Sequence, residues 1–367
     1  MGTENSEQPL HPGRVAIVIV NYNGWRDTLE CLESVRQLDY PDFLTVVVDN
    51  ASQDDSPARL WDWASHKDDF LLVDYPEAVG RDGGEAGKEK SLATATPANR
   101  AVLIRNSVNS GPTGGGNLGI EYALSREPPA HYVFLLDNDA TVQKDTLTHL
   151  VDLDREENAG VVGGVVLSKE TGEIQFAERT TLLRWFFHPL VKADMALPGE
   201  GVDYWPSAGV SGPAMLIRRD VLETMHAATG RYLAAETFID GWEFEFCYRS
   251  SLAGYRSLVT RKGFVRHKGE RMTRCAIRPM RYYYTTRSPL LFAPDFLPLH
   301  WRLLFYPCHA VLSLGRVAKV LKLGRPDAAR AIMSGWWDGI RGERSIWHES
   351  KRGSDARAEA ERRRETF

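Results

Sequence analysis

Short apolar segments alternate with helical patterns along the first half of the chain, and this alternation predicts an α/β fold with a mostly parallel sheet flanked by helices. Four uninterrupted apolar runs, the first two rich in β-branched residues, occupy residues 15–20, 44–48, 101–104 and 132–136. Runs without polar alternation suit strands that are buried on both faces, as in a parallel sheet. Shorter strand-like runs follow at residues 214–217 and 257–259.

Helical periodicity fills the segments between the predicted strands. Leu29, Leu32 and Val35 are spaced to share one helix face, and helical patterns at residues 116–124 and 146–153 follow the third and fourth strands. In sheets of this kind, ligands bind at the carboxyl ends of the strands. The polar residues that directly follow each strand are therefore the candidates for a functional site.

The same patterns predict how the chain is divided. One large domain is expected at residues 14–288, with a first half at 14–150 and a second half at 151–288. A polar tail at 1–13 precedes it, and an amphipathic helical region at 289–350 and a charged tail at 351–367 follow it. Residues 76–99 interrupt the alternation with Gly, Lys, Glu, Ala and Thr and few large apolar side chains, which predicts a mobile surface insertion.

Composition and charge argue against several classes of protein. The formal net charge is −4, whereas a nucleic-acid binder normally carries a strongly basic face. The four cysteines lie far apart without a CxxC motif, which favours reduced thiols in a cytoplasmic protein. The N-terminus lacks a signal-peptide pattern, and no uncharged run reaches the roughly 18 residues of a spanning helix. We therefore expect a protein that does not cross a membrane but can be peripheral to one.

Polar side chains follow the first two predicted strands. Asn21 and Asn23 end the first strand, and Asp49 and Ser52 follow the second. A carboxylate and amides at adjacent strand ends can bind ribose hydroxyls and base edges by hydrogen bonds. The alternative is that these residues only form turns, for which Asn, Asp and Ser are well suited.

Two carboxylates follow the fourth predicted strand at spacing i and i+2. Asp137 and Asp139 can both reach one divalent cation from this strand end. A hard cation such as Mg²⁺ or Mn²⁺ prefers oxygen ligands and binds through carboxylates together with substrate phosphates. A simple turn at the strand end is the alternative. The position after a strand and downstream of a Gly-rich segment favours the metal site.

That Gly-rich segment, residues 109–117, lies between the third strand and a helix and includes Gly114, Gly115 and Asn117. Glycines let a backbone approach a ligand closely and expose its amide groups. The segment is neither GxGxxG nor a P-loop. It predicts a ligand-binding loop, with a flexible connector as the alternative.

Taken in order, these motifs resemble the nucleotide-sugar-binding half of family 2 glycosyltransferases. Residues 238–249, Phe-Ile-Asp-Gly-Trp-Glu-Phe-Glu-Phe-Cys-Tyr-Arg, are similar to the F-I-D-x-x-D-x-E-W-C-x-R segment of the rhamnosyltransferase-like branch. The resemblance covers about residues 15–344. It implies a GT-A fold and an inverting, metal-dependent hexosyltransferase that uses Mg²⁺ or Mn²⁺. The implied donor is dTDP-rhamnose or a UDP-sugar, and the implied acceptor is a hydroxyl of a glycan, polysaccharide or natural product.

The resemblance also implies roles for single residues. Asn21 and Asp49 would contact the nucleoside, Gly114 to Asn117 would line the donor site, and Asp139 with Asp137 would hold the metal. Glu243 stands at the position of the catalytic base, where the family usually has Asp, so Asp240 and Glu245 stay in contention. His267 matches a histidine that approaches the metal, with an ordinary hydrogen-bonded histidine as the alternative. Trp242 and Arg249 would belong to the donor site, although the aromatic residues here can also pack into the core.

A basic amphipathic helix is expected at residues 310–325. It can lie on an anionic membrane near a lipid-linked acceptor, or pack on the main domain or on the partner of a homodimer. Two rival functions stay open. A nucleotidyltransferase would need a basic Gly-rich signature near its first strand, which is absent here. A sugar-binding scaffold without activity is the other, and the Glu at the base position is the observation in its favour.

Overall fold

The computed structural model describes residues 13–177, 186, 197–239, 241–269, 278–344, 346 and 347. The chain forms two compact units. The first consists of Met1–Ala235 and Gly241–Arg271, and the second of Glu236–Asp240 and Met272–Phe367. The predicted tails at 1–13 and 351–367 lie outside the described residues, apart from Gly13.

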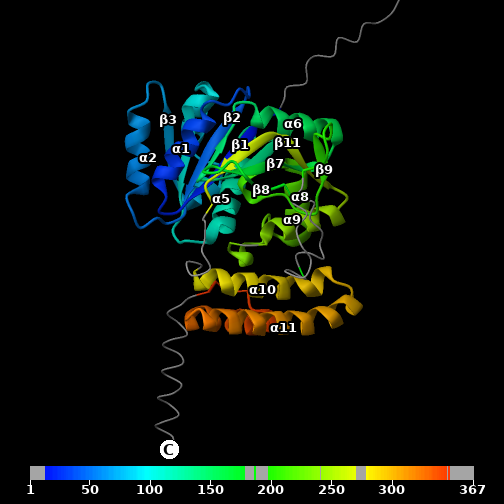
Figure 1. The fold of residues 1–367 in the computed structure, drawn as a ribbon. Helices are drawn as coiled ribbons and strands as arrows, with labels where there is room; N and C mark the ends of the chain where they lie inside the picture. Colours follow the sequence, from blue (N-terminus) through cyan, green and yellow to red (C-terminus); the bar gives the residue numbers. More distant parts are fainter. Residues whose placement is uncertain are drawn as a thin grey trace, which may run out of the picture. The chain divides into compact units, whose positions relative to one another are not determined.

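A single mixed sheet is the centre of the first unit (Figure 1). Its described strands follow the order β3-β4-β2-β1-β5-β10-β7-β11-β6, with β8 beside β7 and β9 beside β11. The strands β1 to β5 are parallel, and β10 runs antiparallel to both β5 and β7. Their bounds are β1 (Val15–Asn21), β2 (Phe43–Asp49), β3 (Leu71–Pro76), β4 (Arg100–Arg105), β5 (Tyr132–Asp137), β6 (Ala140–Val142), β7 (Gly160–Ser168), β8 (Ile174–Phe176), β9 (Tyr204–Pro206), β10 (Met215–Arg218) and β11 (Arg256–His267).

Helices cover both faces of this sheet, and each face has its own hydrophobic core. On one face, α1 (Trp25–Val35), α2 (Ser56–Ser65) and α6 (Thr146–Glu157) contribute buried side chains to one core. On the other, α5 (Gly111–Ser125), α8 (Arg219–Thr229) and α9 (Trp242–Leu252) contribute to the second. Alternate residues of β1 divide between the cores, with Ile17 in the first and Val18 in the second. The uninterrupted apolar run of β1 is explained by burial on both faces.

Strand register brings three polar strand ends to one edge of the sheet. Asn21 is paired with Asp49 across β1 and β2, and Val20 is paired with Asp137 across β1 and β5. The carboxyl ends of these parallel strands therefore lie level with one another. The predicted α/β fold is confirmed, and the polar residues that the sequence singled out lie at this edge.

Residues 76–99, for which the composition predicts a mobile insertion, contain regular secondary structure. Two helices and a short 3₁₀ turn occupy this stretch: α3 (Glu77–Arg81), α4 (Ala86–Thr94) and η1 (Pro97–Asn99). The buried Glu89 anchors α4, because its carboxylate forms an ion pair with Arg126 and accepts hydrogen bonds from the hydroxyls of Tyr75 and Tyr122. Such a pair satisfies a buried charge, and composition alone does not reveal it.

The Gly-rich segment also differs from its prediction, because most of it is helical. The helix α5 begins at Gly111 and so includes Gly114, Gly115 and Asn117. A Cβ atom on Gly115 would lie 2.7 Å from a methyl carbon of Val20, and one on Gly119 would lie 2.3 Å from a methyl carbon of Val18. These two glycines therefore let the helix pack closely on β1.

Three helices, α10 (Pro279–Phe296), α11 (Leu299–Lys322) and α12 (Pro326–Arg341), form the described part of the second unit together with residues 236–239. The fully buried Arg287 guanidinium lies about 5 Å from the ring centroids of Tyr283 and Tyr284. The Tyr283 hydroxyl donates to Asp338 of α12 at 2.7 Å. These contacts tie residues 279–288 to the C-terminal helices, so the boundary expected after residue 288 lies earlier in the chain. Among the described residues, no helix combines the length and the apolar character that a membrane span requires.

Candidate active site

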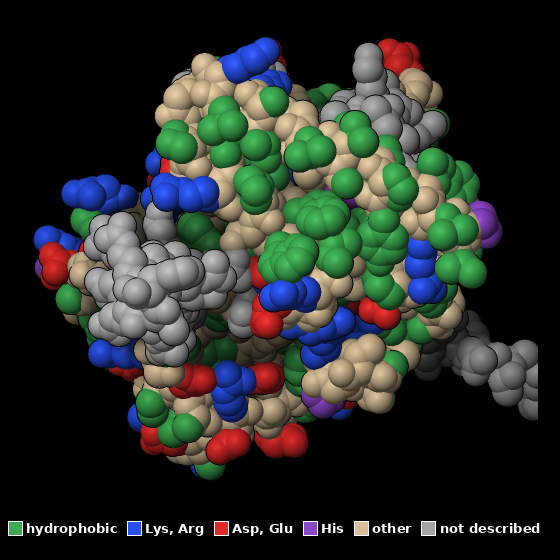
Figure 2. Space-filling view, turned by 90° about the horizontal axis from the view of Figure 1, so that it is seen from below, with side chains coloured by type: hydrophobic (Ala, Val, Ile, Leu, Met, Phe, Trp, Pro, Cys, Tyr) green, Lys and Arg blue, Asp and Glu red, His purple; other side chains and the backbone are tan. Residues whose placement is uncertain are grey.

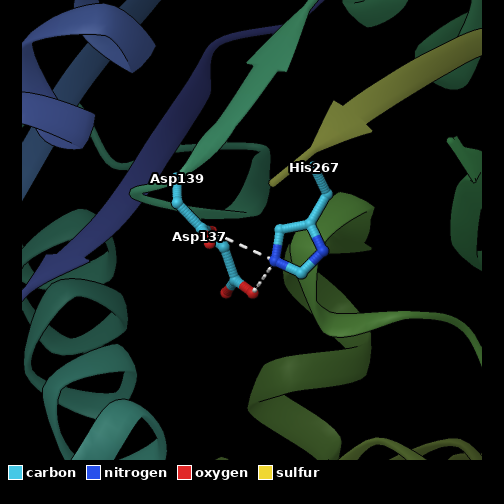
Figure 3. A group of neighbouring side chains, drawn as sticks. All are labelled: Asp137, Asp139 and His267. Carbon is cyan, nitrogen blue, oxygen red and sulfur yellow. Dashed lines mark ion pairs between the residues drawn. The ribbon is translucent and has the colours of Figure 1, made fainter. Parts of the chain in front are cut away.

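Three side chains that can bind a metal ion meet at the carboxyl edge of the sheet (Figure 3). Asp137, Asp139 and His267 each offer one ligand atom, and these atoms lie within 4.8 Å of one another. The His267 Nε2 atom is 3.0 Å from a carboxylate oxygen of Asp139 and 3.5 Å from one of Asp137. This is the arrangement that the sequence predicted for the metal ligands.

The backbone around the cluster explains how residues 128 positions apart meet. Asp137 ends β5, and the chain turns through Asn138 and Asp139 into β6. The short strand β6 pairs antiparallel with the end of β11, so that Ala140 lies opposite His267. The backbone N–H of Lys268 donates to the carbonyl oxygen of Asp139 at 3.1 Å. The sheet therefore fixes the backbones of both carboxylates and of the histidine.

Electrostatics within the cluster favour a positive charge between the two carboxylates. Partial burial and the negative charge of Asp139 raise the pKa of Asp137 to about 6, against the opposing effect of His267. Burial works against ionisation of Asp139. The hydrogen bond and the charge of His267 outweigh this effect and lower the pKa of Asp139 below its usual value. Burial likewise disfavours charge on His267, whereas the two carboxylates raise its pKa above the usual value. The two carboxylates thus favour a positive charge beside them, which a divalent cation held by the three side chains would supply.

Gln175 of β8 orients this histidine. Its side-chain oxygen lies 2.9 Å from His267 Nδ1, so Nδ1 donates and Nε2 is directed at the carboxylates. The Gln175 side-chain nitrogen donates to the His267 carbonyl oxygen at 3.1 Å, which fixes the amide orientation. A partner on the second ring nitrogen is typical of histidines that ligate metals. Sequence reasoning missed Gln175, because nothing in the sequence links it to a residue 92 positions away.

Replacing Gln175 with leucine is expected to weaken Mn²⁺ binding about 10- to 100-fold, because the ring loses the partner that fixes its tautomer. Mn²⁺ titration by calorimetry measures this directly, without donor or turnover. The variant Gln143→Leu, outside the cluster, is the control. Equal Mn²⁺ affinity of wild type and Gln175→Leu would show that Gln175 does not position His267 for metal binding.

The donor set fits a divalent cation of intermediate hardness. Two carboxylate oxygens and one imidazole nitrogen suit Mn²⁺, and the carboxylates alone suit Mg²⁺ with substrate phosphates as further ligands. Burial, together with the charge of Asp139, raises the pKa of Asp137, and a cation between the carboxylates would offset both effects.

The predicted nucleoside-contacting residues lie together at the ends of β1 and β2, and they bind one another. Asn21 is fully buried, and its amide donates to Asp49 at 2.8 Å and to Ser52 at 3.1 Å. The Asn21 oxygen accepts from Thr28 at 2.8 Å. Asn23 adopts a positive φ of 53°, and its side-chain oxygen accepts backbone N–H groups of residues 53 and 54. These bonds give the two loops one defined shape.

Asn50 links these loops to the start of α5, a role that sequence reasoning did not assign. Its side-chain oxygen accepts from Asn106 at 2.8 Å and from the Ser110 hydroxyl at 3.1 Å. Further along α5, Asn117 exchanges two hydrogen bonds with the backbone of Leu233, at 2.9 and 3.1 Å. The α5 glycines and Asn117 thus position the helix against the strand and the 231–235 segment.

Glu243 lies in the first turn of α9. A Cβ atom on Gly212 would be 3.0 Å from a Glu243 carboxylate oxygen. Gly212 begins the 3₁₀ turn η2 (Gly212–Ala214), directly before β10. Since Met215 pairs with Leu135 in an antiparallel register, the start of β10 lies at the edge where β5 ends in Asp137. The candidate base and the candidate metal ligands therefore share one edge of the sheet.

The other residues predicted around the base have different surroundings. Glu245 is fully buried and forms ion pairs with Arg249 at 2.9 Å and Arg231 at 3.3 Å. Arg249 also donates to the Tyr232 carbonyl oxygen at 2.6 Å. Trp242 is part of the hydrophobic core, which is the alternative that the sequence left open. Asp240 lies outside the described residues.

Replacing Glu245 with glutamine is expected to destabilise the protein by about 3–5 kcal/mol, because it removes a buried carboxylate that pairs with the buried Arg249 and the partly exposed Arg231. Urea unfolding followed by circular dichroism measures the change. Glu223→Gln, an exposed partner of Arg219 on α8, is the matched control and should cost less than ~1 kcal/mol. A similar loss for both variants would show that the buried pairs contribute no special stability.

Comparison with known proteins shows the family and the fold of the chain. The family model described as Glycosyl transferase family 2 matches residues 16–84 and 88–225, which is more than half of the chain. This match includes most of residues 76–99, so α3 and α4 belong to the matched domain. The low-salt glycan biosynthesis hexosyltransferase Agl10 of Haloferax volcanii is 27% identical over 236 residues, which are 64% of this chain and 61% of that protein. The chain thus spans less than two thirds of that relative.

Two solved structures share the fold. The mannosyltransferase PcManGT from Pyrobaculum calidifontis, in complex with GDP-Man and Mn²⁺, is similar with a TM-score of 0.53 and 16% identity, over 91% of this chain and 88% of that one. GalNAc-T7 with UDP, GalNAc and Mn²⁺ is similar with a TM-score of 0.53 and 14% identity, over 91% of this chain and 58% of that one. The chain therefore has the GT-A fold, with an additional C-terminal helical region.

Proposed function

We propose, because this chain belongs to glycosyl transferase family 2, that it transfers a hexose from a nucleoside-diphosphate donor to an acceptor hydroxyl with inversion at the anomeric carbon. The cluster of Asp137, Asp139 and His267 at the carboxyl edge of the sheet is the observation that carries this proposal. Two carboxylates and an imidazole are suited to Mn²⁺ or Mg²⁺, and the ends of parallel strands are where α/β sheets bind ligands.

The proposed chemistry is a direct displacement. Glu243 takes the proton from the acceptor hydroxyl, and that oxygen attacks the anomeric carbon from the face opposite the nucleotide. Asp137, Asp139 and His267 would hold a cation that stabilises the negative charge of the leaving diphosphate. One carboxylate is sufficient for proton transfer because the diphosphate is already a good leaving group. A glycoside hydrolase would need two carboxyl groups on either side of the bond.

Among the candidate bases, the contacts of the described residues favour Glu243. The Glu245 carboxylate is fully buried and forms ion pairs with Arg249 and Arg231, so its oxygens face these guanidinium groups rather than an acceptor. Glu243 lies instead beside Gly212, next to the edge that carries the metal cluster. Asp240 remains the alternative base.

We propose dTDP-rhamnose, a UDP-sugar or a GDP-sugar as the donor. The first two follow from the motifs, and the third from the mannosyltransferase that was solved with GDP-Man and Mn²⁺. The acceptor would be a glycan, a lipid-linked sugar or a natural product. The protein would act in the cytoplasm, peripheral to the membrane or as a homodimer.

A panel of nucleotide sugars in a thermal-shift assay, with and without Mn²⁺, tests the proposal. A ligand that binds only the folded state raises the melting temperature by mass action. One donor class should stabilise the protein by several degrees, and only when the metal is present. If no nucleotide sugar stabilises well-folded protein with metal, the transferase proposal fails.

That second result would favour a sugar-binding or scaffold protein without activity. Glu243, in the place where the family usually has Asp, is the observation in favour of this reading, since the longer side chain displaces the carboxylate by one methylene. The retained cluster of metal-ligand type counts against it. Measurable metal-dependent donor turnover would exclude it.

A further inference from the structure

The helix α11 presents an apolar side to solvent. Leu303, Val311 and Leu314 are 70%, 68% and 67% exposed. They belong to a stripe that recurs at helical spacing along a helix of 24 residues, or about 36 Å. The members of this α11 stripe are Leu299, Leu303, Leu304, Val311, Leu314 and Leu321.

The opposite side of α11 is mixed, because it buries the apolar Phe305 and Val320 together with polar side chains. His309 and Ser313 are buried. Arg316 donates to the hydroxyls of Thr285 and Thr286 on α10 at 2.9 and 3.1 Å. An ordinary surface helix turns its apolar side to the core and its polar side to water. In α11 the outer side is apolar as well, so this helix exposes a hydrophobic surface that an ordinary surface helix does not.

Neighbouring side chains enlarge the apolar surface. On α12, Met333, Trp337 and Ile340 are all exposed, and the Arg341 guanidinium lies 4.4 Å from the centroid of the Trp337 ring. Figure 2 shows hydrophobic side chains gathered on this side of the molecule, with Lys and Arg beside them. A surface of this kind marks an interaction site rather than an ordinary solvent-facing surface.

Charge in this region is strongly one-sided. Residues 278–344 contain eleven Lys and Arg but four Asp and Glu, although the whole chain has a net charge of −4. No acidic residue occurs from 296 to 326. Of the four acids, Asp338 is buried and Asp327 pairs with Arg325 at 2.7 Å. Lys319 and Lys322, both exposed, border the α11 stripe.

We propose that the α11 stripe docks on the surface of an anionic lipid bilayer, with the helix lying in the plane of the interface. The aliphatic side chains would enter the boundary between headgroups and acyl chains, about 5–10 Å deep, while the lysines contact anionic headgroups. Trp337 and Arg341 have side chains with an apolar body and a polar end, which suits them to the membrane interface. A second copy of the chain is a poorer occupant, because it would bring two cationic surfaces together.

Vesicle co-sedimentation of the full chain tests this docking, without donor or acceptor, so its result is independent of the proposed transfer reaction. The vesicles are phosphatidylcholine alone, or phosphatidylcholine mixed with phosphatidylglycerol. We expect the wild type to bind the mixed vesicles. Val311→Gln with Leu314→Gln should lower that affinity on the order of 10- to 100-fold. The matched control, Val202→Gln with Leu252→Gln, exchanges exposed residues of the first unit and should bind like the wild type.

A second pair of substitutions keeps the test independent of folding effects. Lys319→Glu with Lys322→Glu changes only exposed charges and should lower the affinity for mixed vesicles about tenfold or more, with no such loss on neutral vesicles. The proposal is overturned if the wild type ignores anionic vesicles, or if the Val311 and Leu314 variant binds them like its control. It is also overturned if the wild type is a dimer, the Val311 and Leu314 variant is a monomer, and vesicles do not compete with dimer formation.

Discussion

Replacing Asp139 with alanine is expected to abolish metal-dependent donor binding and to lower turnover by about 10³-fold or more, since a cation at a leaving diphosphate is worth several kcal/mol. Asp139 contributes one of the three ligand atoms and holds His267 at 3.0 Å. Its backbone carbonyl accepts from Lys268 and is unaffected by the substitution. The strand pairing that forms the site should therefore persist in the variant.

Calorimetric titration with a nucleoside diphosphate, in the presence of Mn²⁺, measures this loss. The matched control is Asp62→Ala, an exposed aspartate of α2 whose carboxylate lies 3.7 Å from a ring nitrogen of His66 in the same helix. It should leave nucleotide affinity unchanged. Unchanged affinity in Asp139→Ala itself would mean that the cluster does not bind the donor.

Glu243→Gln is expected to lower turnover by about 10²–10⁴-fold, the usual contribution of a general base. Donor affinity should change little, because the proposed role of this side chain is to accept the proton of the acceptor hydroxyl. The amide has nearly the shape of the carboxylate, so the contact beside Gly212 should be retained. Steady-state kinetics at saturating donor, together with nucleotide titration, separate the two effects.

Two further variants identify the base if Glu243→Gln retains near-normal turnover. Asp240→Asn should then lose turnover with normal stability. Glu245→Gln should lose stability in either case, because its carboxylate lies between two arginines. A loss of turnover in Glu245→Gln at temperatures where it is fully folded would move the base to that residue.

The fold and the pair of carboxylates at the end of β5 were predictable because their signals are local, whereas His267 was a candidate only through the family resemblance. Uninterrupted apolar runs predict buried parallel strands, and such strands carry Asp137 and Asp139 at an end where ligands bind. The α4 helix was not predictable in this way. Its anchor is the buried Glu89 with Arg126, two charged residues that look like surface residues in the sequence.

The surroundings of the site depend on contacts between distant segments, which sequence patterns do not contain. Gln175 reaches His267 only because β7 pairs with both β8 and β11. The glycines of α5 suggested a ligand-binding loop, whereas the close approach of the helix to β1 accounts for Gly115 and Gly119. The aromatic ring of Trp242 is of a kind that can stack on a sugar, but in α9 this side chain packs in the hydrophobic core.

The central claim is that Asp137, Asp139 and His267 bind a divalent cation together with the diphosphate of a nucleotide. Electron paramagnetic resonance of Mn²⁺ tests it most directly, because the signal of the free ion falls as the ion binds. The account predicts a single Mn²⁺ bound by the wild type, more tightly when a nucleoside diphosphate is added, and no such binding by Asp139→Ala. Equal Mn²⁺ binding by the wild type and Asp139→Ala, unaffected by nucleotide, would contradict it.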